Sequence, residues 1–556
     1  MTWQTHEVSN QFDELSGYNL FTSDAALNEA VRAGGAEWAL HALEHYGAEI
    51  GSAESFAQAE EANRHTPELQ TFDGRGRRID SVAFHPSWHA LMAKQRNAGL
   101  VSQSLRDAQP GRWVAHMAGL YMQAQVEAGS TCPTVMTWAC IPLLRNEPAL
   151  WAQCGDKLLS TAYDPRDLPI AGKRSIYVGM GMTEKQGGSD VRANTTEARP
   201  VDAGGRGAEY LLRGHKWFFS APMCDAHLVV AQLADQGPSC FFVPRWRPDG
   251  TKNPVQIQRL KDKLGNRSNS SSEVEFHDAL GILIGEPGRG IPTIIEMANH
   301  TRLACVVASA GMVRQALVQA LAYARQRQAF GKPLADQPLM RSVLADLALE
   351  SEAALVLAMR LARAFENSDG KDGDPAERIW KRVITPAAKF WVCKRAVEIS
   401  GEAMEVLGGN GYVETGPLAR LYRETPVNSI WEGSGNVMCL DVMRAFAREP
   451  AALFELLDGL EADAAEDGAI TREITLLRAL LQGAPDTLEA RGRQVAQRLV
   501  LLVQAALLRQ HAPAFVADAF IATRLADPAW GRVVGAIDPA RVDVDALLER
   551  ALAPQL

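Results

Sequence analysis

The segment MTEKQGGSDVRANTTEA, residues 182–198, combines a glycine pair with hydroxyl and carboxylate side chains. Ser189 and Asp190 follow the glycines at once, so the segment is too polar for an interior strand. One interpretation is a glycine turn between two strands, in which Ser and Asp satisfy their own backbone. The other is that these groups contact a ligand. The segment lacks GxGxxG and precedes strands rather than a helix, so it does not indicate a Rossmann phosphate site.

Short runs of β-branched and aromatic residues surround this segment from Ser175 to about Gly285, separated by Gly, Pro, Asn and Asp. They predict an all-β module. The preceding residues read as mostly helical, with FDGRGRRID from Phe72 interpreted as a solvated basic loop. After Gly285, apolar residues recur every three or four positions, which predicts helices. The predicted class is α+β, with a helical, a β, a helical and an appended helical domain over residues 1–177, 178–285, 286–446 and 447–556.

The composition of the 556-residue chain argues against some classes of function. A hydrophobic content of 47% is enough for several packed units. The net charge of −9 gives no global attraction to nucleic acids or anionic membranes. The amino-terminal residues lack the features of a secretory signal, and the longest apolar run, LVLLVQAALL from Leu499, predicts a buried helix rather than a membrane span. We therefore expect a cytoplasmic protein with no membrane partner.

The cysteines are scattered, without CxxC pairs or histidines at metal-ligand spacing. This pattern fits reduced thiols in a cytoplasmic protein. We expect no metal site and no disulfide framework. The eight cysteines lie at positions 132, 140, 154, 224, 240, 305, 393 and 439.

Three further segments contain unusual groupings of residues. GHKWFFSAP, from Gly214, has three consecutive aromatics, which belong either to a sheet buried on both faces or to a cover for a flat cofactor ring whose edge Ser220 would bind. The other segments are EVLGGNGYVE, from Glu405, and RETPVNSIWEGSGNVMCLDVMR, from Arg423. In the last, Glu432 lies in a Trp-Glu-Gly-Ser-Gly context, where a lone glutamate is usually a capping carboxylate.

In this order, the segments resemble the acyl-CoA dehydrogenase flavoprotein superfamily, whose patterns include TExxxGSD, GxKxWI[ST], RxxFGxxxxxxQ, GGxGY and YEGT. Essentially the whole chain, including LKDKLGNRSNSS and QVEAGSTCP, is similar to the AidB branch, the bacterial alkylation-response flavoproteins, which are isovaleryl-CoA dehydrogenase-like. This similarity weakens only in the last ~100 residues. The matches are Thr183, Glu184, Gly188, Ser189 and Asp190; Gly214, Lys216, Phe218 and Ser220; Arg327, Phe330, Gly331 and Gln337; Gly408, Gly409, Gly411 and Tyr412; and Trp431 to Ser434.

The resemblance implies an acyl-CoA dehydrogenase-like fold, in which an N-terminal helical domain, a central antiparallel β-barrel or sandwich and a helical bundle carry FAD. Phe218 would lie beside the flavin and Ser220 near its reactive nitrogen. Arg327, Phe330 and Gln337, with Glu405 to Gly409, would form the surface that holds the adenine and pyrophosphate of FAD bound mainly in a neighbouring subunit, which implies a homotetramer. The implied cofactor-binding residues are Met182, Thr183, Gly188, Ser189, Trp217, Phe218, Ser220, Arg327, Phe330, Gln337, Glu405 (where glutamine is usual), Gly408, Gly409, Ser434 and Asn436.

The implied reaction is oxidoreductase chemistry, in which a base removes the α-proton of an acyl-CoA thioester while the β-hydride passes to the flavin. The base must be a carboxylate in a dry site. Glu432 aligns with the usual base position of the family. The alternative position, used by isovaleryl-type enzymes, falls at Thr301, which cannot serve. Trp431, next to the base, is bulky enough to restrict the acyl pocket.

The resemblance also raises DNA binding, because AidB-type proteins are associated with double-stranded DNA through a basic carboxy-terminal domain. Residues 447–556 depart from that pattern: 16 acidic residues outnumber 11 arginines, and lysine is absent. Arg491, Arg498 and Arg509 share one side of a predicted helix, but Val495 and Leu502 share it too, which favours arginines flanking a packed helix. The alternative is a stripe formed in the tetramer by Arg444, Arg448, Arg472 and Arg478 together with arginines from another subunit.

Three functions therefore compete. The first is a flavin-dependent acyl-CoA dehydrogenase, of weak activity as AidB-type proteins are regarded, whose family expectation for an electron acceptor is electron-transfer flavoprotein. The second is a DNA-associated flavoprotein of the alkylation response. The third is a protein that retains FAD for structure alone.

Overall fold

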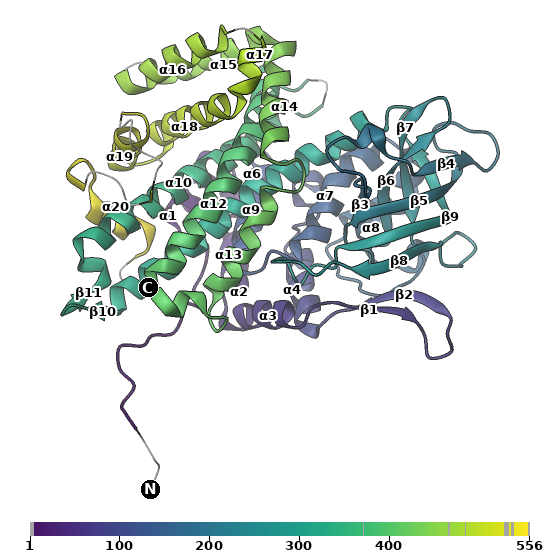
Figure 1. Ribbon diagram of the computed structural model, residues 1–556, viewed down its shortest axis with the longest axis horizontal. Helices are drawn as coiled ribbons and strands as arrows, with labels where there is room; N and C mark the ends of the chain where they lie inside the picture. The colour runs from purple at the N-terminus through teal and green to yellow at the C-terminus, as the bar shows by residue number, and fades with distance from the viewer. Residues whose placement is uncertain are drawn as a thin grey trace. The chain divides into compact units, whose positions relative to one another are not determined.

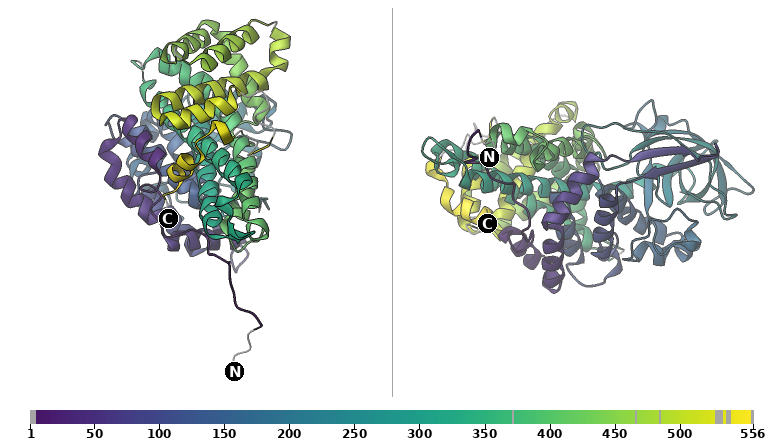
Figure 2. Two further views of the ribbon diagram at one scale, coloured as in Figure 1. Left: turned by 90° about the vertical axis from the view of Figure 1, so that its left-hand side faces the viewer. Right: turned by 90° about the horizontal axis from the view of Figure 1, so that it is seen from below.

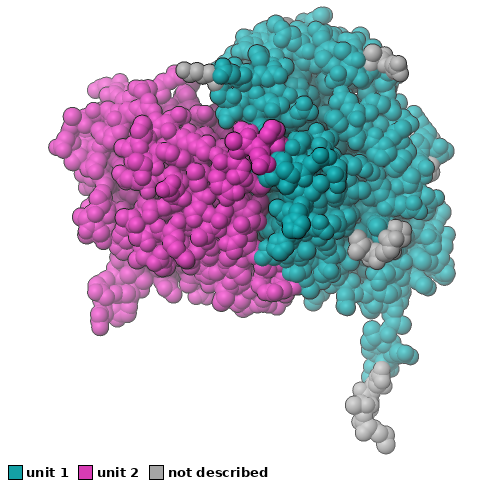
Figure 3. Space-filling model, turned by 180° about the vertical axis from the view of Figure 1, so that it is seen from behind, with its two compact units in different colours: residues 1–53, 113–125, 305–556 teal, residues 54–112, 126–304 magenta. Residues whose placement is uncertain are grey.

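The computed structural model describes residues 5–370, 372–464, 467–483, 485–526, 533–534 and 539–553. Contacts divide the chain into two compact units, each built from several segments (Figure 3). Unit 1 contains residues 1–53, 113–125 and 305–556, and unit 2 contains residues 54–112 and 126–304. The four domains expected from the sequence were delimited by their type of secondary structure, whereas these two units are delimited by contacts. The boundaries of the four domains therefore stay predictions.

Unit 2 contains a seven-stranded sheet (Figure 1). The strands follow the order β3, β5, β4, β6, β7, β9, β8, and further pairings of β3 with β6 and of β5 with β9 close it toward a barrel. Most pairs are antiparallel, as predicted, whereas β3 and β4 each pair with β6 in parallel. The strands are β3 (Val178–Gly181), β4 (Glu197–Pro200), β5 (Glu209–Phe219), β6 (Ala226–Leu233), β7 (Gly237–Pro244), β8 (Val255–Leu260) and β9 (Ser272–Ile284).

A hairpin of β1 (Glu68–Phe72) and β2 (Arg78–Ala83) lies beside β8 (Figure 1). The interpretation of FDGRGRRID as a solvated loop is wrong at both ends of the segment, because Phe72 belongs to β1 and the residues from Arg78 belong to β2. Only the turn that begins at Asp73 is a loop. Leu69 and Val82 pack against the core of the sheet, which explains why this polar sequence forms strands. The helices of unit 2 are α3 (Ala53–Arg64), α4 (Pro86–Asn97), α5 (Gln103–Arg106), α7 (Thr131–Arg145) and α8 (Pro148–Leu159).

Unit 1 is helical. α9 (Gly290–Gln326), which begins in unit 2, is the one helix in the described part of the chain that is apolar and long enough to cross a membrane. Its most apolar window is entirely buried, so this apolarity serves core packing. The other long helices are α1 (Ala25–Ala33), α2 (Leu40–Ile50), α6 (Arg112–Val126), α10 (Pro338–Asn367), α12 (Thr385–Val406), α13 (Pro417–Asn428) and α14 (Gly435–Arg448), with a short α11 (Pro375–Ile379).

The appended carboxy-terminal region forms helices that stack on the rest of unit 1 (Figures 1 and 2). α18 contains the apolar run from Leu499, whose residues are buried as predicted, and packs on α10, α12, α14 and α16. Val495 and Leu502 are fully buried between the flanking arginines, which also agrees with the prediction. The helices are α15 (Pro450–Asp463), α16 (Gly468–Leu481), α17 (Pro485–Ala490), α18 (Gly492–His511), α19 (Ala514–Arg524) and α20 (Val544–Ala551).

Candidate functional site

In unit 2, the polar loop that follows β3 is joined directly to the end of β5. The backbone N–H of Trp217 donates to the carbonyl of Thr183 at 2.8 Å, and Gly181 pairs with Phe219. Gly188 lies so close to Thr183 that an added Cβ would be 2.5 Å from its Oγ1. The fold therefore brings together the two segments that the sequence analysis assigned to the flavin.

A buried ion pair fastens the same two segments. Nζ of Lys216, on β5, lies 2.6 Å from Oε1 of Glu184, in the loop, and neither side chain is exposed. Glu184 also accepts hydrogen bonds from the backbone N–H groups of Thr195 and Thr196. Burial opposes ionisation of Glu184, but the Lys216 ammonium and these donors hold its pKa down at about 2. The carboxylate is thus a structural anchor of the loop rather than a proton acceptor.

The three consecutive aromatics of β5 have different environments. Phe219 is buried in the core and stacks on His227. Phe218, in contrast, is 51% exposed, and Trp217 is half-buried. Nζ of Lys261 lies 3.4 Å from the Trp217 ring centroid and 4.6 Å from that of Phe218. Only one of the three rings therefore belongs to the core of the sheet.

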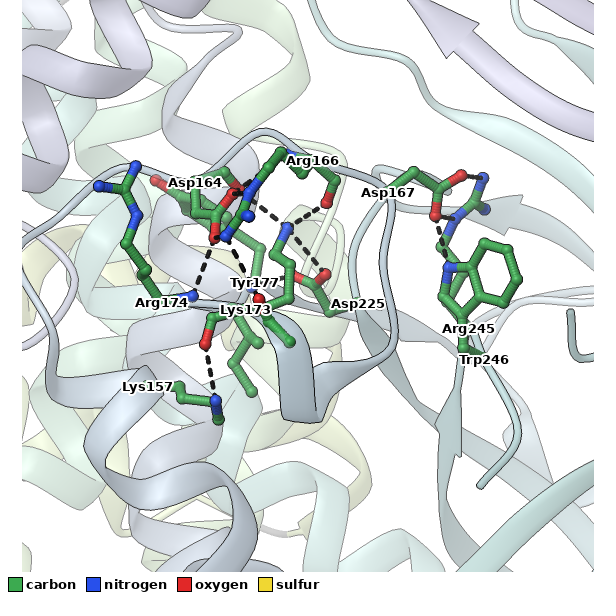
Figure 4. A network of polar contacts seen from close by, with 12 residues as sticks. Lys157, Asp164, Arg166, Asp167, Lys173, Arg174, Tyr177, Asp225, Arg245 and Trp246 are labelled. Carbon is green, nitrogen blue, oxygen red and sulfur yellow. Dashed lines mark hydrogen bonds and ion pairs between the residues drawn. The ribbon is translucent and has the colours of Figure 1, made fainter. Parts of the chain in front are cut away.

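A network of charged side chains anchors the start of β3 (Figure 4). Asp225 accepts a hydrogen bond from the Tyr177 backbone N–H at 2.8 Å and lies 3.1 Å from Nζ of Lys173. Lys173 also donates to the carbonyls of Asp164 and Arg166. Burial raises the pKa of Asp225 to about 6, although the Lys173 ammonium opposes the shift. The network fixes the strand that leads into the polar loop.

In unit 1, the turn between α13 and α14 carries Glu432, which is partly buried. Its φ of +59° is a left-handed conformation that is uncommon for any residue except glycine. The buried Lys389, on α12, donates from Nζ to the carbonyls of Asn428 and Gly433, at 2.9 and 2.8 Å. Lys389 therefore clamps both ends of the turn and holds Glu432 in this conformation.

Further contacts fix Trp431, the residue before Glu432. Its Nε1 donates to Oδ1 of Asn428 at 3.0 Å, and Nδ2 of Asn428 donates to Oγ of Ser309 at 3.1 Å. Ser309 lies on α9, so the turn is attached to the core helix as well as to α12. Thr301, the alternative base position, is buried and donates from Oγ1 to the carbonyl of Ala298, within its own helix turn.

A second cluster in unit 1 contains Arg327, Phe330 and Gln337. Nε2 of Gln337 donates to the carbonyl of Ala329 at 2.9 Å, and a guanidinium N–H of Arg327 donates to the carbonyl of Asn10. Phe330 is 98% exposed and has a φ of +52°. The turn with Gly408 and Gly409 is near this cluster, because Asn410 donates to Gln11 and to the Tyr323 hydroxyl. Glu405, Gly408 and Gly409 are exposed.

The two groups of predicted residues in unit 1 lie far apart. Lys389, beside the Glu432 turn, and Gly408 are 19 residues apart along α12 and the turn that follows it. At 1.5 Å per residue, this separation is about 28 Å. Ser434 and Asn436, both exposed, lie at the Glu432 end. In one subunit, the predicted residues around Glu432 and those around Gly408 therefore lie on two separate surfaces.

Sequence reasoning missed Lys389 and Asn428 as residues that position Glu432. The one available signal for Lys389 was its place in PAAKFWVC, where apolar residues on both sides indicate a buried lysine. It also missed a possible ligand group outside the site: Glu61, His65 and His85 bring three ligand atoms within 4.8 Å of one another. His85 is 20 residues from His65, so spacing alone did not reveal the group. All eight cysteines are buried, and none of them forms a disulfide bond.

Three protein-family models match successive segments of the chain. The family described as "Adaptive response protein AidB N-terminal domain" matches residues 10–165. The acyl-CoA dehydrogenase middle domain matches residues 179–279, and the acyl-CoA dehydrogenase C-terminal domain matches residues 288–447. The chain is 47% identical to AidB of Escherichia coli (strain K12), over 94% of each chain.

Two solved structures are similar in fold. ACDH-11 of Caenorhabditis elegans, in complex with C11-CoA, has a TM-score of 0.84 and 26% identity, covering 99% of this chain and 95% of its own. An acyl-CoA dehydrogenase from Bacillus anthracis, complexed with FAD, has a TM-score of 0.66 and 20% identity, covering 78% and 80%. At that identity, the second likeness concerns the fold alone.

Proposed function

The chain belongs to the AidB branch of the acyl-CoA dehydrogenase family, and from this premise we propose that it is an FAD-dependent oxidoreductase that dehydrogenates an acyl-CoA thioester. The observation that carries the proposal is the Glu432 turn. The buried Lys389 holds the backbone of Glu432 at a φ of +59°, which is a strained conformation. Such strained residues are concentrated at functional sites.

The residues of unit 2 fit the isoalloxazine end of FAD. Phe218 presents half of its surface, unlike Phe219 in the core, and the close approach of Gly188 to Thr183 keeps the loop backbone free of a side chain there. Met182, Thr183, Ser189, Trp217 and Ser220 would surround the flavin together with Phe218. When bound, FAD supplies the acceptor for the hydride that leaves the β-carbon of the substrate.

Glu432 would accept the α-proton of the thioester. The clamp from Lys389 positions the carboxylate before substrate arrives, which saves the cost of ordering it during the reaction. Trp431, fixed through Asn428, would form one wall of the acyl pocket. The substrate class is a fatty acyl-CoA, supported by the similarity to a relative whose structure contains C11-CoA.

We further propose that the protein is a homotetramer in which one subunit completes the FAD site of another. The separation of about 28 Å between the Glu432 end of α12 and the Gly408 turn supports this arrangement, because the family resemblance places both on FAD. Phe330, Leu339 and Tyr412 are 98%, 86% and 79% exposed, which is unusual for such large apolar side chains. Electron-transfer flavoprotein is the proposed electron acceptor, and a cytoplasmic location remains part of the proposal.

Binding of double-stranded DNA is the alternative function, carried by the similarity to AidB. Five arginines of the appended region are paired with carboxylates, which reduces the positive charge available to a phosphate backbone. The paired arginines are Arg478, Arg498, Arg509, Arg524 and Arg550. Anisotropy of a labelled duplex tests this alternative: a steep loss of affinity between 50 and 200 mM salt supports electrostatic binding, and no binding at the lower salt excludes it.

The experiment that tests the main proposal is an anaerobic titration with short, branched and long acyl-CoAs, C11-CoA included, while the oxidised-flavin absorbance is followed. We expect one class to bleach the flavin. Glu432→Gln should slow the bleaching by orders of magnitude without loss of FAD, whereas Glu455→Gln, an exposed glutamate on α15, should not change it. Bleaching by no thioester, with FAD bound, would refute the dehydrogenase and leave a structural role for FAD.

A further inference from the structure

Arg493, at the start of α18 in the appended region, reaches the turn that follows Glu432. Its Nε donates to Oδ1 of Asn436 at 2.8 Å. Its guanidinium carbon also lies 5.8 Å from the ring centroid of Phe390, on α12. Asn436 is one of the residues that the family resemblance assigns to FAD, so an appended helix touches the predicted cofactor site.

Arg493 differs from the five paired arginines in having no carboxylate partner among the described residues. Those five are neutralised locally, for example Arg524 by Asp346 and Glu350 in the interior. The charge of Arg493 is therefore not compensated by an adjacent acidic group. An uncompensated guanidinium with several N–H donors is the typical recognition group for phosphate.

A second cation lies near the same Phe390 ring as Arg493. Nζ of Lys394 is 5.9 Å from the same Phe390 ring, and it too has no carboxylate partner among the described side chains. The stem of Lys394 packs on Gly435, where an added Cβ would be 2.8 Å from its Cε. Burial raises the pKa of the nearby Cys439 thiol to about 11, while Arg493 and Lys394 both act to lower it. The two positive charges thus converge on the start of α14.

A cavity of about 600 Å³ is lined in part by Arg493. It is lined by Asn436, Cys439 and Leu440 of α14 and by Glu489, Gly492 and Arg493 of the appended region. Among the described residues that line the cavity, Glu489 is the one with an acidic side chain. The cavity is large enough for a nucleotide moiety, and the first backbone N–H groups of α14 add to the positive potential at its edge.

We infer that Arg493 and Lys394 bind the phosphate-bearing adenylate half of FAD, so that the appended region is part of the cofactor site. This inference rests on the proposed function, because it takes FAD as the cofactor. The other source of an adenylate phosphate is CoA, but the contact of Arg493 with Asn436, beside the assigned Ser434, favours FAD. The appended domain then does more than stabilise packing: its removal would weaken FAD binding.

The test is equilibrium titration of apoprotein with FAD and with riboflavin, followed by flavin fluorescence, which does not depend on turnover. We expect Arg493→Gln to weaken FAD binding by about 10-fold or more, with Arg493→Lys between it and the wild type. Riboflavin, which has no phosphate, should bind all three proteins equally. Arg491→Gln, two positions away and also exposed, serves as the matched control and should bind FAD like the wild type.

The outcomes separate the possible failures. If the wild type binds FAD and Arg493→Gln binds it equally well, the inference is wrong and the proposed function stands. If Arg493→Gln weakens only CoA binding, measured by calorimetry on the FAD-loaded proteins, the inference is also wrong because the phosphate belongs to CoA. If the wild type binds no FAD, the proposed function fails, and the inference fails with it. Equal unfolding temperatures of the apoproteins will show that the variants are folded.

Discussion

Lys216 and Glu184 form an ion pair with 2.6 Å between Nζ and Oε1, and both side chains are completely buried. One lies on β5 and the other in the loop after β3, so the pair connects the two segments proposed to hold the flavin. Burial lowers the pKa of Lys216 to about 8, and the Glu184 carboxylate keeps it from falling further. Each residue is therefore tolerated in the interior only because of the other.

Replacement of one partner should be far more harmful than replacement of both. Lys216→Met leaves the Glu184 carboxylate buried without its cation and should cost about 3–5 kcal/mol of unfolding free energy. The double variant Lys216→Met with Glu184→Gln should recover much of this loss. Denaturant unfolding of the apoprotein measures the effect. Lys185→Met, at an exposed neighbouring position, is the control and should change stability by less than about 0.5 kcal/mol.

Asp225 should make stability depend on pH in the acidic range. Its pKa is raised from 3.8 to about 6, so the folded state binds a proton more tightly than the unfolded state does. The resulting stabilisation is complete below pH 3.8 and is lost as the pH rises through 6. The stability of the wild type relative to Asp225→Asn should therefore fall by up to about 3 kcal/mol between pH 4 and 6. If the stability of the wild type relative to Asp225→Asn were constant or rose with pH, burial would not be the dominant influence on the pKa of Asp225.

Lys389→Met should impair catalysis through the position of Glu432. The variant removes the hydrogen bonds to the carbonyls of Asn428 and Gly433 and frees the turn. We expect the rate of flavin reduction by a saturating acyl-CoA to fall by about 10-fold or more, because the carboxylate is no longer pre-positioned. Stopped-flow absorbance measures this rate. An unchanged rate, at unchanged FAD content, would mean that the turn keeps its conformation without the clamp.

Leu339→Asp should disrupt the proposed homotetramer. Leu339 is 86% exposed at the start of α10, next to the Arg327 and Phe330 cluster, and an aspartate there would place a charge in a subunit contact. Light scattering coupled to gel filtration should show a lower mass than for the wild type. Leu476→Asp, at a 48% exposed leucine on α16, is the matched control and should keep the wild-type mass. Equal masses for both variants would place the interface elsewhere.

The order of helices, sheet and helices could be predicted from the sequence because the period of apolar residues is a local property. The same is true of the buried helix from Leu499 and of the motif-bearing loops around Met182 and Glu432, since each is recognisable within a few consecutive residues. The hairpin of β1 and β2 was missed for the converse reason. Its sequence is polar, and it becomes strand through the packing of Leu69 and Val82 against a distant core.

Tertiary structure was needed for every contact between residues far apart in the chain. Glu184 reads as part of a motif, but its burial with Lys216 depends on β3 and β5 meeting in one sheet. Likewise, nothing local marks Lys389 as the clamp of Glu432, or Arg493 as the partner of Asn436. Composition and periodicity record what each segment prefers, whereas desolvation, hydrogen-bond geometry and charge pairing depend on which segments the fold brings together.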